Sequence, residues 1–273
     1  MFETESVARS LVSYIQQKQY LPEDLLLFNE LWQSWDHHSR FSHPSAEDAL
    51  AAINQSQKTA HTFLKQADWL IITLGSSFAY KLTENSRFVA NCHKAPGQWF
   101  TKQLLSIDDQ IATLDNTIHQ LFHFNPHLKI IFTISPVRHL RDGVVENNRS
   151  KARLLETVHH LVNKFDRLFY FPAYELVIDV LRDYRFYDID LAHPNYAATQ
   201  FVMEKFSDYA FTDATKALIK EVRQIVTAKN HKAFHPQSLQ HQQFRKQHYE
   251  KALRLQEEHP YLDLQDELSF FLS

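Results

Sequence analysis

The chain has 273 residues, enough to bury a core in one domain or in a domain with a helical annex. Hydrophobic residues make up 44% of the sequence and aromatic residues 13%, which excludes a disordered protein. The net charge is −3 and no basic stripe is present, so we expect neither nucleic acid nor a membrane as a partner.

Glycine and cysteine are both rare. The glycines Gly75, Gly97 and Gly143 lie far apart, which excludes the glycine-rich loops that cradle phosphate groups. Cys92 is the single cysteine, which is compatible with a reducing compartment. The first residues lack the apolar region of a signal peptide, and no run is long enough to span a bilayer, so we expect a soluble, cytoplasmic protein.

Histidine is abundant, with 17 residues, but the spacings typical of metal sites are absent. Neighbouring histidines such as His37 and His38 diverge instead of converging on one ion. We therefore expect neither a metal nor a cofactor.

The first part of the chain predicts helices around an irregular segment. Apolar residues at helical spacing predict a helix over residues 4–18, and Ser45 caps a long helix that reaches Gln66. Between them, residues 31–45 mix two Trp, three His, Asp36 and Arg40. This segment either lines a site or is an ordered loop whose Trp residues plug the edge of a core.

Strands and helices then alternate. Residues 68–75, 129–134 and 168–171 predict strands, and the apolar run of the first predicts burial on both of its faces. Helices are expected at 106–124, at 150–164 and after Pro172. This order predicts an α/β fold with a parallel sheet, although three strands are few for such a fold, so we expect that one strand is missing.

Polar residues follow these elements at one end of the sheet. The expected rim comprises Ser76, Ser77, Ser135, Arg138, His139, Asp190 and His193. Ligands of open parallel sheets bind at the carboxyl ends of strands. The plain alternative is that Ser76 and Ser77 only form a turn.

Asp190 precedes His193 by three residues, and Pro194 follows. We expect a helix to begin at Pro194, with Asp190 holding one ring nitrogen of His193 and leaving the other for a substrate. This is the acid and base of a serine-hydrolase triad. The alternative is that Asp190 caps the helix and His193 is a surface residue.

Asn91, Cys92 and His93 are adjacent in the sequence. A thiol nucleophile paired with His93 is disfavoured, because sequence neighbours seldom form a working pair and an inert, half-buried cysteine is the commoner case. From Thr212 onward the chain is charged, glutamine-rich and helical, and we interpret residues 212–273 as an extension for packing or partner contact.

Several blocks resemble the GSCFA family, an uncharacterised branch of the SGNH/GDSL-type hydrolase superfamily. They are LWQSWDHHSRFS (31–42), ADWLIITLGSSFAY (67–80), NCHK (91–94), ISPVRHLRDG (134–143), SKARL (150–154) and YFPAYELVIDVLRDYRFYDIDLAHP (170–194). The resemblance implies a flavodoxin-like three-layer sandwich over residues 1–211, with Asp190 and His193 as triad acid and base. Gly75 and Ser76 fall in the segment that usually supplies oxyanion contacts; Ser77, Asn91, His93, Ser135, Arg138 and His139 are expected around the pocket.

The sequence departs from this family in one respect. The Gly-Ser-Cys-Phe-Ala motif, whose Ser occupies the nucleophile position, lies before the LWQSWDHH block in the family, and this sequence lacks it. Gly75-Ser76-Ser77-Phe78-Ala79 looks similar but aligns with a later block, so we do not transfer the nucleophile role to it. The absent N-terminal segment would also supply the missing strand, and a misplaced start, a shortened chain or a natural loss would each account for its absence.

Three functions remain open. The first is an ester or acetyl-ester hydrolase, or an acyltransferase, that acts on an acylated carbohydrate or another small ester with the nucleophile on the absent segment. The second is a catalytically inactive binding or scaffold protein that retains the fold. The third uses Ser76 as a relocated nucleophile, which requires its Oγ within hydrogen-bond reach of His193 Nε2.

Overall fold

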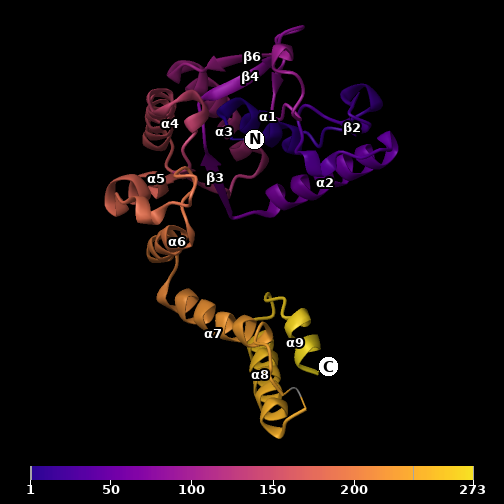
Figure 1. Ribbon diagram of the computed structural model, residues 1–273, viewed down its shortest axis with the longest axis vertical. Coiled ribbons are helices and arrows are strands. Elements are labelled where there is room, and N and C mark those ends of the chain that lie inside the picture. Colours follow the sequence, from indigo (N-terminus) through magenta and orange to yellow (C-terminus); the bar gives the residue numbers. More distant parts are fainter. Residues whose placement is uncertain (1, 236, 273) are drawn as a thin grey trace. The chain divides into compact units, whose positions relative to one another are not determined.

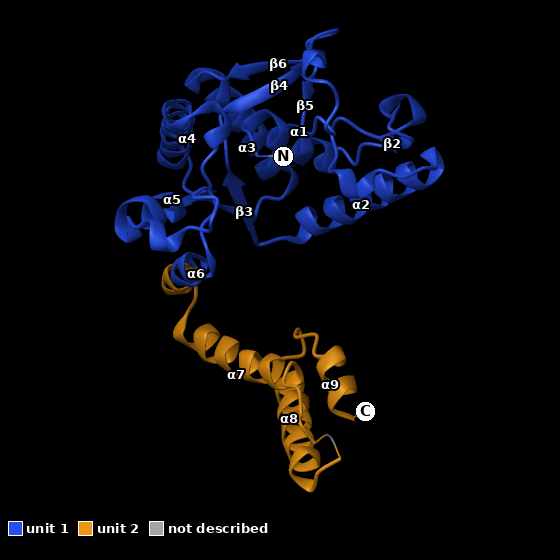
Figure 2. Ribbon diagram, viewed as in Figure 1, with its two compact units in different colours: residues 1–202 blue, residues 203–273 orange. Residues whose placement is uncertain are grey.

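The computed structural model describes residues 2–235 and 237–272. The chain divides into two compact units, residues 1–202 and 203–273 (Figure 2). We describe each unit by itself.

A parallel three-stranded sheet forms the centre of the first unit. Strands β3 (Trp69–Leu74), β7 (Lys129–Ile134) and β8 (Leu168–Phe171) lie in the order β3-β7-β8, with Leu70 opposite Ile130 and Ile130 opposite Leu168. Helix α3 (Ile107–Phe124) precedes β7, and α4 (Val144–Lys164) connects β7 with β8. The predicted α/β fold with a parallel sheet and a helical C-terminal region is confirmed, and it is consistent with an α/β sandwich.

The core lies on one face of this sheet. Ile72, Leu74, Phe132 and Ile134 point to this face and are buried. Helices α1 (Thr4–Ile15), α2 (Ala46–Gln66), α3 and α4 cover it with apolar residues at helical spacing. Ser45 and Ser106 cap α2 and α3 by accepting a backbone N–H with Oγ, as their positions predict.

Strand β3 is not buried on both faces, so that prediction is wrong. Within the described residues it pairs only with β7 and forms the edge of the sheet. Its second face is open: Trp69 is 47% exposed and Ile71 52%. In the described part of the chain, the apolar run therefore belongs to a strand that has one partly exposed face and no strand partner on its outer edge.

An antiparallel sheet follows β3, which the sequence analysis did not predict. Strands β4 (Phe78–Leu82), β5 (Phe88–Val89) and β6 (Phe100–Leu104) lie in the order β5-β4-β6. Figure 1 shows β4 and β6 side by side. A two-stranded hairpin of β1 (Leu26–Phe28) and β2 (Leu31–Gln33) occurs earlier in the chain. Short 3₁₀ helices span Pro22–Asp24, Ser39–Phe41, Gly97–Trp99, Leu140–Asp142 and Tyr184–Phe186.

The segment after β8 is irregular. One short helical turn, α5 (Ala173–Glu175), continues into a π-helix, η5 (Leu176–Leu181). Helix α6 (Tyr196–Ala210) begins two residues after Pro194, so the prediction that Pro194 starts the helix is wrong. Pro194 instead bridges to Tyr187, and Asn195 Oδ1 accepts the N–H of Ala198 in the first turn of α6.

The second unit is helical. Helices α7 (Asp213–Lys229), α8 (Leu239–Glu258) and α9 (Gln265–Leu272) enclose a small core of their own. Ile225, Ala252 and Leu255 are buried in it. Two of its cross-helix ion pairs, Lys229–Glu267 and Arg254–Glu221, join the helices at the rim of that core.

Candidate functional site

Asp190 and His193 form a hydrogen-bonded pair in the loop before α6. Asp190 Oδ2 lies 2.6 Å from His193 Nδ1. The other carboxylate oxygen, Oδ1, accepts the backbone N–H groups of Ala192 at 2.9 Å and of His193 at 3.0 Å. Across residues 2–235 and 237–272, no hydrogen bond reaches Nε2 of His193, so this nitrogen is available to a substrate.

The hydrogen bonds that Asp190 accepts keep its carboxylate ionised. The N–H groups of His193 and Ala192, together with the His193 ring, lower the pKa of Asp190 to about 2. The carboxylate is therefore ionised at neutral pH and orients the imidazole by accepting from Nδ1. Leu191, between the two residues, has a φ of 55°, a conformation that is uncommon for a branched side chain. Such local strain occurs at functional sites, but it also serves the turn that folds the carboxylate back onto the ring.

The Asp190–His193 loop lies against the segment that follows β7. The N–H of Arg138 donates to the carbonyl of Ala192 at 3.0 Å. The guanidinium of Arg138 lies 4.6 Å from the ring centre of Tyr187 and 5.5 Å from that of Tyr184. Arg138 thus fixes this loop at the carboxyl end of the parallel sheet.

Ser76 and Ser77, at the end of β3, point into the protein. Ser76 Oγ lies 3.3 Å from Ser150 Oγ and accepts the N–H of Phe78 at 3.0 Å. Ser77 is fully buried; its N–H donates to Ser150 Oγ at 2.7 Å and its hydroxyl donates to the Ser150 carbonyl at 2.8 Å. Within the described residues no hydrogen bond joins either serine to His193.

The backbone N–H groups expected to stabilise an oxyanion are occupied. Those of Gly75 and Ser76 both donate to the carbonyl of Phe2, at 2.7 and 3.2 Å. The first residues of the chain therefore lie at the carboxyl end of β3. Two neighbouring N–H groups that hold one carbonyl oxygen have the donor arrangement of an oxyanion hole.

Lys151 is a buried cation that the sequence analysis missed. Its ammonium donates to the carbonyls of Gly75 and Ser135, both at 2.6 Å, and so ties together the ends of β3 and β7. Burial lowers its pKa to about 8, so it remains largely protonated at pH 7. His139 Nε2 lies 3.1 Å from the same Gly75 carbonyl, and burial lowers the pKa of His139. The signal was present: Lys151 shares the buried stripe of α4 with Asn147 and Leu154.

Replacing Ser150 tests this packing. In Ser150→Ala the buried N–H of Ser77 loses its acceptor, which should lower the free energy of unfolding by about 1–3 kcal/mol. Urea unfolding followed by circular dichroism measures the change. Ser56→Ala, a half-buried serine within α2, is the control and should change the stability by less than about 0.5 kcal/mol. Equal effects would show that the Ser150 contacts do not stabilise the rim.

The family models identify the chain. Residues 1–206 match the model described as GSCFA family. The chain belongs to the GSCFA family. Residues 222–273 match a second model, described as GSCFA domain protein, C-terminal domain. No curated protein and no solved structure matches the chain.

In this GSCFA chain a cavity of about 380 Å³ opens at the carboxyl ends of β3 and β7. Of the predicted site residues, Ser76, Arg138 and His139 line it. Glu3 also lines it and is 7% exposed; burial raises the pKa of its carboxyl group. Asp190 and His193 are not among the described residues of the lining, and their side chains are 50% and 61% exposed.

Other predicted residues have structural contacts. Asn91 and His93 lie with the loop of residues 34–39: His93 Nε2 is 2.8 Å from the Ser34 carbonyl, and Asn91 Nδ2 donates to Ser39 Oγ at 3.1 Å. Burial lowers the pKa of His93. Ser135 Oγ accepts the N–H of Val137. Burial raises the pKa of Cys92, as expected of an inert thiol.

Residues 31–45 were expected either to line a site or to form an ordered loop, and the structure shows features of both. Trp35 packs edge-on against Phe100 with ring centres 5.5 Å apart, and its carbonyl accepts the N–H of Ala90 at 2.8 Å, as in an ordered loop. The next residue, Asp36, lines a second cavity, beside α1.

The described residues offer neither a metal-binding cluster nor a membrane-spanning helix. They contain no group of three or more His, Cys, Asp or Glu that is suited to a metal ion. In the same part of the chain, every helix is too short or too polar to cross a bilayer.

Proposed function

We propose that this GSCFA protein is an SGNH-type ester hydrolase in which Asp190 orients His193 as the catalytic base. The 2.6 Å contact between Asp190 Oδ2 and His193 Nδ1 carries the proposal. The ionised acid holds the proton on Nδ1, so Nε2 is the nitrogen that accepts one. His193 would take the proton from a serine hydroxyl as it attacks the ester carbonyl, and then give it to the leaving alkoxide.

The nucleophilic serine of this proposal belongs to the Gly-Ser-Cys-Phe-Ala segment of the family resemblance. Ser76 and Ser77 are poor candidates because Ser150 and the Phe78 N–H already occupy their hydroxyls. Two observations support a contribution from an N-terminal segment. Among the described residues β3 pairs only with β7, so its outer edge can accept one more strand, and the carbonyl of Phe2 contacts the end of that edge.

The substrate we propose is an acylated carbohydrate or a similar small ester. The cavity at the strand ends contains Arg138, His139 and Lys102, which suit the polar oxygens of an ester. We also propose that the protein acts in the cytoplasm.

Fluorophosphonate labelling tests the proposal on two proteins: this chain, and the chain with an N-terminal extension that supplies a strand ending in Gly-Ser-Cys-Phe-Ala. We expect no label on the chain itself and label on the motif serine of the extended protein. His193→Ala should slow labelling of the extended protein by about 10²–10⁴-fold, because the serine loses its base. His123→Ala, an exposed histidine of α3, is the matched control and should change nothing.

Two results would contradict this mechanism. Label on Ser76 or Ser77, lost in His193→Ala, would place the nucleophile within the chain. An extended protein that folds but takes no label would favour the second candidate, a binding or scaffold protein. The exposure of Asp190 and His193, both at least half accessible, is the observation that favours that candidate.

A further inference from the structure

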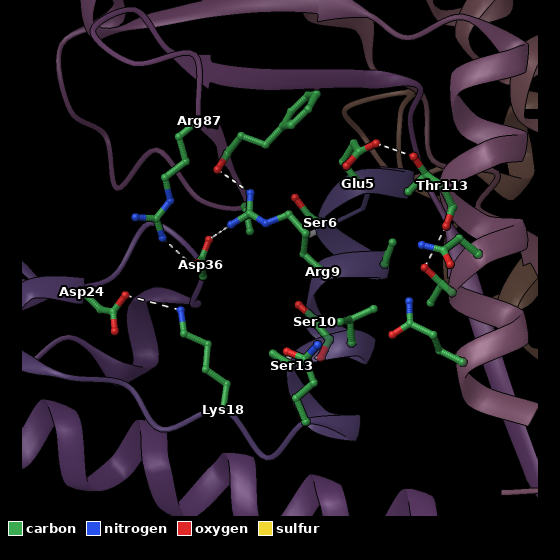
Figure 3. Close-up of a pocket in the computed structure, with 18 of the residues that line it drawn as sticks. Glu5, Ser6, Arg9, Ser10, Ser13, Lys18, Asp24, Asp36, Arg87 and Thr113 are labelled. Carbon is green, nitrogen blue, oxygen red and sulfur yellow. Dashed lines mark hydrogen bonds and ion pairs between the residues drawn. The ribbon is translucent and has the colours of Figure 1, made fainter. Parts of the chain in front are cut away.

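The second cavity is larger and lies next to the first. It has a volume of about 750 Å³ and extends along α1 (Figure 3). Ser6 and Ala90 belong to the linings of both cavities, so the two spaces adjoin. The larger cavity therefore continues the proposed ester site toward α1 and α3.

The charges that line the larger cavity cancel one another. Arg87 Nη2 lies 2.7 Å from Asp36 Oδ2, and Arg9 forms an ion pair with Oδ1 of the same carboxylate. Lys18 Nζ lies 3.4 Å from Asp24 Oδ1, so the second acid is also paired (Figure 3). The remaining acid, Glu5, accepts a hydrogen bond from Thr113 Oγ1 at 2.6 Å. This balance disfavours a strongly charged ligand.

Uncharged polar groups occupy much of the remaining wall. On α3, Thr113, Asn116 and Gln120 follow one another at helical spacing and line the cavity. Across residues 2–235 and 237–272, no hydrogen bond engages the side-chain amide of Asn116 or of Gln120. Each amide both donates and accepts, as a hydroxyl does.

Ser6 lies where the two cavities adjoin. The residue is 2% exposed, its N–H donates to Glu3 Oε1 at 2.8 Å, and its hydroxyl interacts with the same carboxyl group. The wall is therefore polar at the point where the two cavities adjoin.

We propose that the larger cavity binds the neutral, polyhydroxylated part of the substrate, a saccharide, while its acyl group lies in the smaller cavity. The inference rests on the proposed ester hydrolase. A neutral saccharide matches the balanced charges of the wall, and its hydroxyl groups pair with amides and serines in either direction. The volume lies within the range of about 300–1,000 Å³ that is typical of small-molecule sites.

Saturation-transfer NMR on the 273-residue protein tests the inference with four probes: cellotetraose, xylotetraose, chitotetraose and the anionic tetragalacturonate. We expect at least one neutral tetrasaccharide to bind and tetragalacturonate to bind more weakly. In Gln120→Ala the Kd of that saccharide should rise about fivefold to tenfold, because one or two hydrogen bonds are lost. Gln66→Ala, an exposed glutamine at the end of α2, is the matched control and should leave the Kd unchanged.

The outcomes separate this inference from the hydrolase. No binding of any neutral probe, or binding of tetragalacturonate alone, would overturn it. A Kd that is unchanged in both Gln120→Ala and Asn116→Ala would also overturn it, because the saccharide would then bind elsewhere. Saccharide binding needs no nucleophile, so it can succeed while the labelling experiment fails, and the reverse also holds.

Discussion

Replacing Asn125 with alanine is expected to lower the free energy of unfolding by about 2–5 kcal/mol, because two backbone carbonyls lose their donor. Asn125 is 5% exposed and lies between the end of α3 and β7. Its Nδ2 donates to the carbonyls of Leu64 at 2.9 Å and Ala67 at 2.7 Å, and its Oδ1 accepts the N–H of His127 at 3.1 Å. One side chain thus joins the end of α2 to the turn before the central strand.

Guanidinium unfolding of Asn125→Ala at pH 7 measures the change. Asn148→Ala, an exposed asparagine of α4, is the control and should cost less than about 0.5 kcal/mol. Asn125→Asp keeps the size but has no N–H donors, and it should be at least as unstable as Asn125→Ala. A loss below 1 kcal/mol for Asn125→Ala would show that water replaces the amide at these carbonyls.

The stability of the first unit should fall by about 3 kcal/mol through His37 between pH 6.5 and pH 4. Burial lowers the pKa of His37 to about 4, although Asp36 opposes the shift. The ring lies edge-on to Tyr20, with centres 4.6 Å apart, and Nδ1 is 3.1 Å from Ser34 Oγ. In this window the unfolded chain binds a proton that the folded protein does not, so stability is lost as the pH falls.

Unfolding free energies of the protein and of His37→Gln from pH 7 to pH 4 isolate this contribution. The variant keeps a polar side chain but cannot titrate, so its stability should fall less steeply with pH. His123→Gln, an exposed histidine on α3, should follow the unmodified protein. Parallel curves for the protein and His37→Gln would contradict the expected role of this buried ring.

The parallel sheet could be predicted because its signals are local. Long apolar runs such as residues 129–134 favour buried strands, and serine caps mark where α2 and α3 begin. The antiparallel strands β4 and β6 were missed because each has only five residues and contains a lysine, Lys81 or Lys102, that interrupts its apolar pattern. The exposure of β3 could not be predicted. An apolar run shows that a strand is suited to burial, but it does not show which other elements pack against the strand.

The candidate site was only partly predictable for a similar reason. The spacing of Asp190 and His193 indicated the hydrogen bond that the structure contains. Helical spacing placed Lys151 on the buried stripe of α4, but spacing gives no information on contacts between distant elements, so the contacts of Lys151 and Ser150 were missed. Asn91 and His93 were expected around the pocket, but their hydrogen bonds are with residues 34–39. Membership of a family block therefore does not determine which cavity a side chain lines.

The open edge of β3 also bears on the behaviour of the protein in solution. Among the described residues no strand pairs with its outer side, and Trp69 and Ile71 are exposed beside it. Exposed apolar edge strands act as templates for pairing with another chain, so this edge is expected to drive self-association at high concentration. A strand that covered it would therefore protect the protein against aggregation as well as bring residues to the site.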